Sequence, residues 1–153
     1  MKRPFIFLVT ALLLLGLGTT LLTAQTPRPR SLAQTLRASR WQKRILLVAA
    51  PTATQADFQR QKALLAANQA QLADRDMLVL DVLYDQLPAA DRQFLAQKIG
   101  LPPAGFVVVL IGKDGGVKAK STHPMAPATL FATVDGMPMR RAEMQRTHAG
   151  HQP

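Results

Sequence analysis

The sequence predicts an α/β domain with a mixed central sheet of about four strands flanked by helices, and three observations carry this prediction. Two apolar runs without alternation, residues 45–50 and 106–111, are typical of strands covered on both faces. A third strand candidate, residues 77–84, is separated from the first run by a long segment with a helical apolar stripe. An Asp-Gly step at 114–115 predicts a tight hairpin into a fourth strand.

The first half of the domain is predicted as strand, helix, strand. Thr54-Gln55-Ala56-Asp57 resembles a capping box, with Asp in place of the usual Glu or Gln, and so predicts Thr54 as the cap of a helix running to about residue 73. The seven-residue spacing of its large apolar side chains describes one buried stripe: Phe58, Leu65 and Leu72. A strand, a helix and a second strand in this order predict a right-handed parallel unit.

The second half is predicted as helix, hairpin, helix. Pro88 suits the first turn of a helix and Gly100 its end. Residues 117–120 alternate apolar and basic, as an edge strand does when lysines discourage strand addition. Pro127 opens the last predicted helix, which Gly136 and Pro138 end.

The resulting order, β-α-β-α-β-β-α with a closing antiparallel hairpin, is that of thioredoxin-like domains. More specific segments resemble the DUF4174 family, a domain of unknown function of bacterial exported proteins that is similar to a repeated domain of vertebrate extracellular proteins of the equarin group. The resemblance covers about residues 38–146 and implies a thioredoxin- or peroxiredoxin-like fold. The segments that carry it are Ile45–Pro51, Leu110–Lys118 with its Gly-Lys-Asp-Gly-Gly turn, Leu130-Phe131, and Val134–Met144 with Met-Pro-Met-Arg-Arg.

The chain divides into four predicted parts. Residues 1–24 have a basic start, an apolar run and small residues before Gln25, which predicts an exported protein with a signal peptide, the alternative being an uncleaved membrane anchor. Residues 25–43 read as a basic linker or a short helix over Ser31–Lys43. Residues 44–144 form the domain, and residues 145–153 are predicted to be a disordered tail.

The absence of cysteine and the distribution of charge exclude some classes of function. The chain has no cysteine, so its own residues cannot perform thiol chemistry. The formal charge is +10, but residues 45–139 carry as many acidic as basic residues, so the excess lies in the flanks. Basic flanks predict contact with an anionic membrane surface or glycan, or they simply keep the domain soluble; sequence-specific nucleic-acid binding is not expected.

Candidate contact residues lie in two places. In thioredoxin-like domains the reactive residues lie between the first strand and its helix. In this segment of the chain the only residues with a hydroxyl group are Thr52 and Thr54. Either Thr54 caps the helix, or the two threonines and free N–H groups form an anion site. Arg140 and Arg141 are expected to follow a helix C-terminus, where their charges interact favourably with the helix dipole or bind a carboxylate, phosphate or sulfate.

Other motifs give weaker signals. Pro102-Pro103 could contain the cis-proline that precedes the central strand in this fold. The methionines Met137, Met139 and Met144 suit ordinary packing or a soft contact surface. No cofactor motif is present, and the three histidines form no convincing metal site: His123, His148 and His151.

These observations favour a non-catalytic binding or structural module of the envelope or extracellular space, whose partner is a protein, a glycan or an anionic surface. Two alternatives stay open. One is a thiol-independent enzyme with a site near Thr52 and the Pro102-Pro103 loop. The other is association with polyanions or membrane surfaces through the basic flanks.

Overall fold

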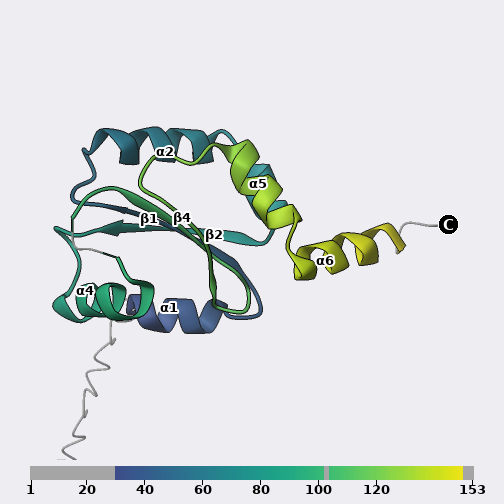
Figure 1. The fold of residues 1–153 in the computed structure, drawn as a ribbon, viewed down its shortest axis with the longest axis horizontal. Coiled ribbons are helices and arrows are strands. Elements are labelled where there is room, and N and C mark those ends of the chain that lie inside the picture. The colour runs from purple at the N-terminus through teal and green to yellow at the C-terminus, as the bar shows by residue number, and fades with distance from the viewer. Residues whose placement is uncertain (1–29, 102–103, 150–153) are drawn as a thin grey trace, which may run out of the picture.

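The computed structural model describes residues 30–101 and 104–149, which form a four-stranded sheet between two layers of helices (Figure 1). The strand order is β2-β1-β3-β4. Strand β1 (Arg44–Ala50) pairs in parallel with β2 (Met77–Leu83) and antiparallel with β3 (Val107–Ile111), which pairs antiparallel with β4 (Val117–Ser121). The predicted mixed sheet and its parallel β-α-β unit are therefore confirmed.

The helices divide between the two faces of the sheet, as Figure 1 shows. One face is covered by α2 (Ala56–Ala66), α3 (Gln69–Asp74) and α5 (Pro127–Asp135). The other face is covered by α1 (Leu32–Ser39), α4 (Ala89–Phe94) and the π-helical turn η1 (Leu95–Ile99).

The two central strands explain the unbroken apolar runs. Every residue of β1 and β3 is buried, because successive side chains point to opposite faces and both faces carry helices. Leu46 and Val48 pack under α2 and α5, whereas Ile45 and Leu47 pack on the side of α1 and η1. Two hydrophobic cores therefore hold the sheet from both sides.

The hairpin between β3 and β4 forms where the Asp-Gly step predicted it. Gly115 has φ +84°, and the Asp114 carboxylate accepts a hydrogen bond of 3.0 Å from the Gly116 N–H. A bulge in β4 then pairs Ala119 with Leu110 and Val117 with the next residue of β3. Val117 consequently lies on the opposite face from Ala119 and is 44% exposed, so the simple alternation predicted for this edge strand is broken.

The predicted long helix over residues 54–73 is divided into α2 and α3. Asn68 separates them, and its side-chain amide donates a 2.8 Å hydrogen bond to the Leu64 carbonyl. An asparagine that bonds the backbone in this way competes with continued helix. The predicted apolar stripe is nevertheless correct, since Phe58, Leu65 and Leu72 are all in the core.

The basic segment before the first strand contains the short helix α1, capped by a reciprocal box between Ser31 and Gln34. Leu32 and Leu36 of this helix pack against the core. Trp41 does not join them: it lies in the turn after α1 with φ +67° and is 60% exposed.

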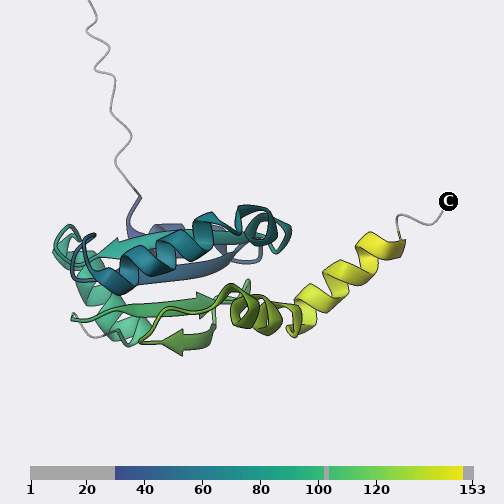
Figure 2. The same ribbon diagram turned by 90° about the horizontal axis from the view of Figure 1, so that it is seen from above.

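The prediction of a disordered tail over residues 145–153 is wrong for residues 145–149, which are helical. Helix α6 (Pro138–Ala149) begins two residues after α5 and projects from the body of the domain (Figures 1 and 2). Pro138, which was expected only to end α5, instead opens α6, because a helix tolerates proline in its first turn. The prediction for residues 150–153 lies outside the described residues.

The predictions for residues 1–24 and 25–29 also lie outside the described residues. Among the helices of residues 30–101 and 104–149, none has the length and apolar character needed to cross a membrane.

Candidate functional site

The position that holds the reactive group in thioredoxin-like domains lies between β1 and α2. Here the hydroxyls of Thr52 and Thr54 are exposed and lie 3.0 Å apart, within hydrogen-bond distance of each other. Thr54 does not cap α2, so that prediction is wrong. The cap is Gln55, whose side-chain oxygen accepts a 2.7 Å hydrogen bond from the Phe58 N–H, because α2 begins one residue later than the capping-box pattern suggested.

Two single substitutions separate these roles. Gln55→Ala is expected to lower the free energy of unfolding by about 1 kcal/mol through loss of the cap. Thr54→Ala is expected to change it by less than about 0.5 kcal/mol, because the hydroxyl is exposed and caps nothing. Urea unfolding curves of the two variants measure the difference; an equal or larger loss for Thr54→Ala would restore the threonine as the cap.

The predicted contact residues are not gathered into one site. Arg140 lies in the first turn of α6, at the end of the sheet where β1 begins, and Thr52 lies beyond the other end of β1. At about 3.3 Å per residue, the strand between these two ends is about 20 Å long. Arg140 and Arg141 follow the end of α5 in the sequence, as predicted, but they lie in the first turn of a further helix, α6. Arg141 is exposed and stays a candidate contact, whereas Pro102 and Pro103 lie outside the described residues.

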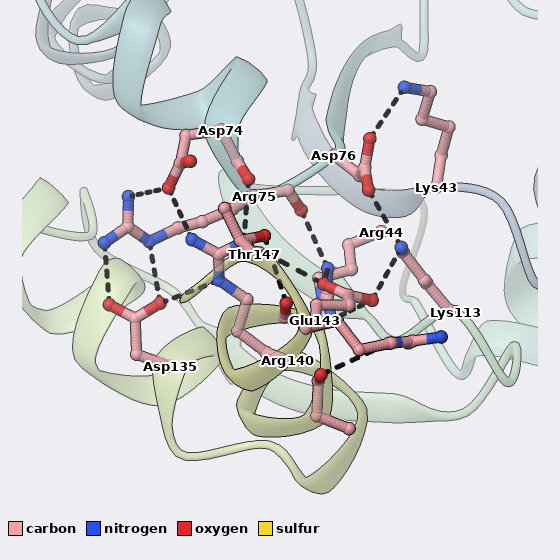
Figure 3. Close-up of polar contacts among 12 residues, drawn as sticks. Lys43, Arg44, Asp74, Arg75, Asp76, Lys113, Asp135, Arg140, Glu143 and Thr147 are labelled. Carbon is pink, nitrogen blue, oxygen red and sulfur yellow. Dashed lines mark hydrogen bonds and ion pairs between the residues drawn. The ribbon is translucent and has the colours of Figure 1, made fainter. Parts of the chain in front are cut away.

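The most organised polar feature of the described residues lies at the Arg140 end and is drawn in Figure 3. It joins the start of β1, the α3–β2 turn, the β3–β4 turn, the end of α5 and the start of α6. We call it the ion-pair cluster, and its members are Lys43, Arg44, Asp74, Arg75, Asp76, Lys113, Asp135, Arg140 and Glu143.

Glu143 is the centre of one half of the ion-pair cluster. Its carboxylate accepts two hydrogen bonds from the guanidinium of Arg44, of 3.1 and 3.2 Å, and one of 2.7 Å from Lys113. Lys113 also donates to Asp76 at 2.9 Å, and Lys43 donates to the same carboxylate at 3.1 Å. The Arg44 side chain is only 1% exposed, so Glu143 supplies the negative charge that a buried guanidinium requires.

Asp135 is the centre of the other half. Its carboxylate accepts hydrogen bonds of 3.0 and 2.6 Å from Arg75, whose guanidinium also lies 4.6 Å from the centre of the Phe131 ring. Arg140 contacts Asp135 and Asp74 and donates a 2.8 Å hydrogen bond to the Asp74 carbonyl. These carboxylates occupy the donors of Arg140 that an external anion would use.

The ion-pair cluster lowers the pKa of its carboxyl groups. The hydrogen bond from Lys113 lowers the pKa of Asp76. Burial opposes ionisation of Glu143, but hydrogen bonds from Lys113 and Arg44 outweigh it, so the pKa of Glu143 lies below its usual value. Burial is likewise outweighed at Asp135 by Arg75 and Arg140, and its pKa is lowered too.

These shifts predict a loss of stability in acid. A carboxyl whose pKa is lower in the folded state stabilises the fold above its unfolded pKa of about 4, and this contribution disappears as the pH falls toward the folded pKa. Urea unfolding is expected to give a constant free energy between about pH 7 and 5 and a decreasing one below about pH 4. In a Glu143→Ala protein the decrease should be smaller; a free energy that does not change between pH 5 and 3 would contradict the assignment.

The ion-pair cluster brings together the segments on which the family resemblance rests. Lys113 comes from the Gly-Lys-Asp-Gly-Gly turn, and Arg140 and Glu143 come from the segment around Met-Pro-Met-Arg-Arg. Sequence reasoning missed the roles of Arg44, Lys113 and Glu143. The available signal was Arg44 itself, a basic residue at the edge of an otherwise apolar buried run.

Two cavities lie near this end of the sheet. The smaller, of about 240 Å³, lies between the β3–β4 turn and the start of α6, with Met137 and Met139 in its wall and Arg44 and Lys113 beside them. The larger, of about 370 Å³, lies between α1, η1 and the β3–β4 turn. Neither of these two cavities is lined by Thr52 or Thr54.

Metal binding gains no support among the described residues, where no three histidine, cysteine, aspartate or glutamate side chains are placed to hold an ion. His123 is exposed and lies 3.2 Å from the Thr122 hydroxyl. The side chain of His148 and the whole of His151 lie outside the described part of the chain.

Comparison with solved structures supports the fold. A reduced 2-Cys peroxiredoxin of Plasmodium vivax superposes with a TM-score of 0.52 at 13% identity, over 71% of this chain and 84% of that one. An N-terminally modified Prx1a of Plasmodium yoelii gives a TM-score of 0.53 at 15% identity, over 71% and 80%. At such identities the similarity shows the peroxiredoxin- and thioredoxin-like fold alone.

Comparison of sequences identifies the family. Coiled-coil domain-containing protein 80 of Danio rerio is 26% identical over 141 residues, which are 76% of this chain but only 16% of that much longer protein. The model of a domain of unknown function, DUF4174, matches residues 35–143. The chain therefore belongs to the DUF4174 family, with a thioredoxin-like fold and no cysteine.

Proposed function

We propose that the protein is a non-catalytic binding or structural module that acts in the cell envelope or the extracellular space. The observation that carries this proposal is the state of the thioredoxin-type position. Its two hydroxyls, on Thr52 and Thr54, are exposed and bonded to each other. A threonine needs an adjacent base to act as a nucleophile, and no described side chain supplies one to either hydroxyl.

The ion-pair cluster supports the same proposal. The charged side chains that the family segments bring together pair with one another, and the buried side chains of Arg44 and Arg140 both contact carboxylates of the cluster. Such an arrangement fixes α6 and the β3–β4 turn to the sheet. It holds surfaces in place rather than presenting an acid or base to a substrate.

The place of action rests on the first 24 residues. Their basic start, apolar run and small residues before Gln25 are the layout of a secretory signal. Mass spectrometry of the protein recovered outside the cytoplasm of its host is the test. A mature chain that begins at Gln25 supports export with cleavage, an intact membrane-bound chain supports the anchor, and retention of the whole chain in the cytoplasm contradicts the proposal.

The binding role is tested by capture without turnover. The protein in the form its host produces is immobilised and exposed to envelope and culture-medium fractions of the same organism. We expect saturable retention of a component that is recovered chemically unchanged, equally with the wild type and with a Thr52→Ala, Thr54→Ala double variant. Conversion of the component by the wild type but not by the double variant would instead make the protein an enzyme.

A further inference from the structure

The larger cavity combines an apolar floor with a basic rim. It opens between α1, the α4–η1 segment and the β3–β4 turn, and its volume of about 370 Å³ falls in the range of small-molecule sites, about 300–1,000 Å³. The floor consists of apolar side chains from both helices and from β1 and β3: Leu36, Ile45, Phe94, Ile99 and Ile111.

The rim carries four cationic side chains and one carboxylate. The carboxylate, Asp114, is bound by Lys118 at 2.6 Å and therefore does not neutralise the rim. Of the cations, Lys43 pairs with Asp76, and the Arg40 guanidinium donates to the Asp114 carbonyl at 3.0 Å.

Two rim cations have no anionic partner among the described residues. Arg37 in the last turn of α1 and Lys98 in η1 form no ion pair or side-chain hydrogen bond there. The two come from different helices and both line the cavity. Their charges are therefore available to a ligand rather than committed to the fold, in contrast to Arg44 and Arg140 of the ion-pair cluster.

The local backbone at η1 is a second, independent observation. Residues 95–99 form a π-helical turn that ends at Gly100 with φ +67°. Such turns are rare, and they occur frequently at functional sites because the widened turn displaces side chains from their normal helical positions. Here the turn supplies Lys98 to the rim and Ile99 to the floor.

We infer that this cavity binds a small amphiphilic anion, with an apolar body on the floor and a carboxylate or phosphate head between Arg37 and Lys98. This inference rests on the proposed binding function and gives it a ligand class. A purely polar anion would leave the apolar floor in water, and a neutral or cationic amphiphile would leave the rim charges without a partner.

Trp41 gives a direct measurement. It is the only tryptophan of the chain, it is 60% exposed, and the rim guanidinium of Arg40 lies 5.4 Å from its ring centre. A head group held between Arg37 and Lys98 adds a negative charge to the cavity that Arg40 also lines, which should alter the contact of Arg40 with Trp41 and change the fluorescence of Trp41. Titration of the protein in the form its host produces is expected to be saturable with decanoate or decyl phosphate, and whichever head binds more tightly identifies the source of the anion.

Matched ligands and variants make the test specific. Acetate and inorganic phosphate lack the tail, and decyltrimethylammonium reverses the head charge, so all three are expected to bind at least about tenfold more weakly. Arg37→Glu with Lys98→Glu is expected to weaken the binding of decanoate or decyl phosphate by at least about tenfold, whereas Arg60→Glu with Arg146→Glu, the same charge change at exposed sites outside the cavity, should not.

Three results would overturn the inference: equal binding of the cationic amphiphile, equal loss in the two double variants, or no saturable binding of either anion up to millimolar concentration. Since all four substituted side chains lie at the surface, circular dichroism should show unchanged folds. Failure of these titrations while envelope capture succeeds would reject the ligand class but leave the binding function standing.

Discussion

Replacing Glu143 by alanine is expected to lower the free energy of unfolding by about 3 kcal/mol, the lower end of the range for breaking a buried ion pair. The substitution leaves the Arg44 guanidinium, 1% exposed, without its bidentate partner and also removes the 2.7 Å contact of Lys113. The lower end applies because the Glu143 side chain is itself 18% exposed. Alanine is a strong helix former, so the helical propensity of α6 does not confound the result.

Two measurements separate the ion pair from a general effect on α6. Urea unfolding gives the global free energy, and amide hydrogen exchange in α6 should accelerate first, because Glu143 fastens this projecting helix to the sheet. Arg141→Ala, on the same helix but exposed, is the matched control and should change stability by less than about 0.5 kcal/mol.

A double variant tests the mechanism of that loss. Arg44→Met combined with Glu143→Ala removes the uncompensated charge and should be more stable than Glu143→Ala alone. A double variant as unstable as the sum of the single variants would show that the two side chains act independently and would contradict the pairing.

The second large effect is expected at Gln61, a fully buried polar residue in α2. Its side-chain oxygen accepts a 2.6 Å hydrogen bond from the Met125 N–H, and its amide donates one of 3.3 Å to the Met125 carbonyl. Gln61 thus satisfies both backbone groups of a buried residue in the segment between β4 and α5. Gln61→Leu preserves the size but leaves both groups unpaired, which is expected to cost about 2–4 kcal/mol.

The measurement is again urea unfolding, with Arg60→Leu as the control. Arg60 is the neighbouring residue of the same helix but is exposed, so its replacement should leave the free energy nearly unchanged. If Gln61→Leu were as stable as the wild type, the leucine would have compensated fully by apolar burial, and the hydrogen bonds to Met125 would carry no net stabilisation.

The strands and the hairpin could be predicted from the sequence because their signals are local. The runs at 45–50 and 106–111 are apolar without interruption since both faces of β1 and β3 are covered, and Gly115 adopts the positive φ that its turn requires. The apolar stripe of α2 was also readable, although Gln61, which lies on that stripe, was not recognised as a buried partner for Met125.

The predictions that failed depend on competition between side-chain hydrogen bonds or on contacts between residues far apart in the chain. The cap of α2 is Gln55, which accepts from the Phe58 N–H, whereas the Thr54 hydroxyl is within hydrogen-bond distance of Thr52 instead. Asn68 divides the predicted helix by bonding to the Leu64 carbonyl. Helix α6 was missed because Glu143 anchors it to Arg44, which lies 99 residues away in the chain. No local pattern reports such a contact.

The central claim is that the protein binds through the α1–η1 side rather than reacting at residues 51–54. The most direct test places a photoreactive residue either at Ala33, an uncharged residue of α1 in the cavity wall, or at Thr54 of the full chain in the producing organism. We predict that irradiation yields covalent adducts with an anionic amphiphile from position 33 and none above background from position 54. Adducts formed predominantly from position 54 would contradict the claim and would place the functional site at residues 51–54.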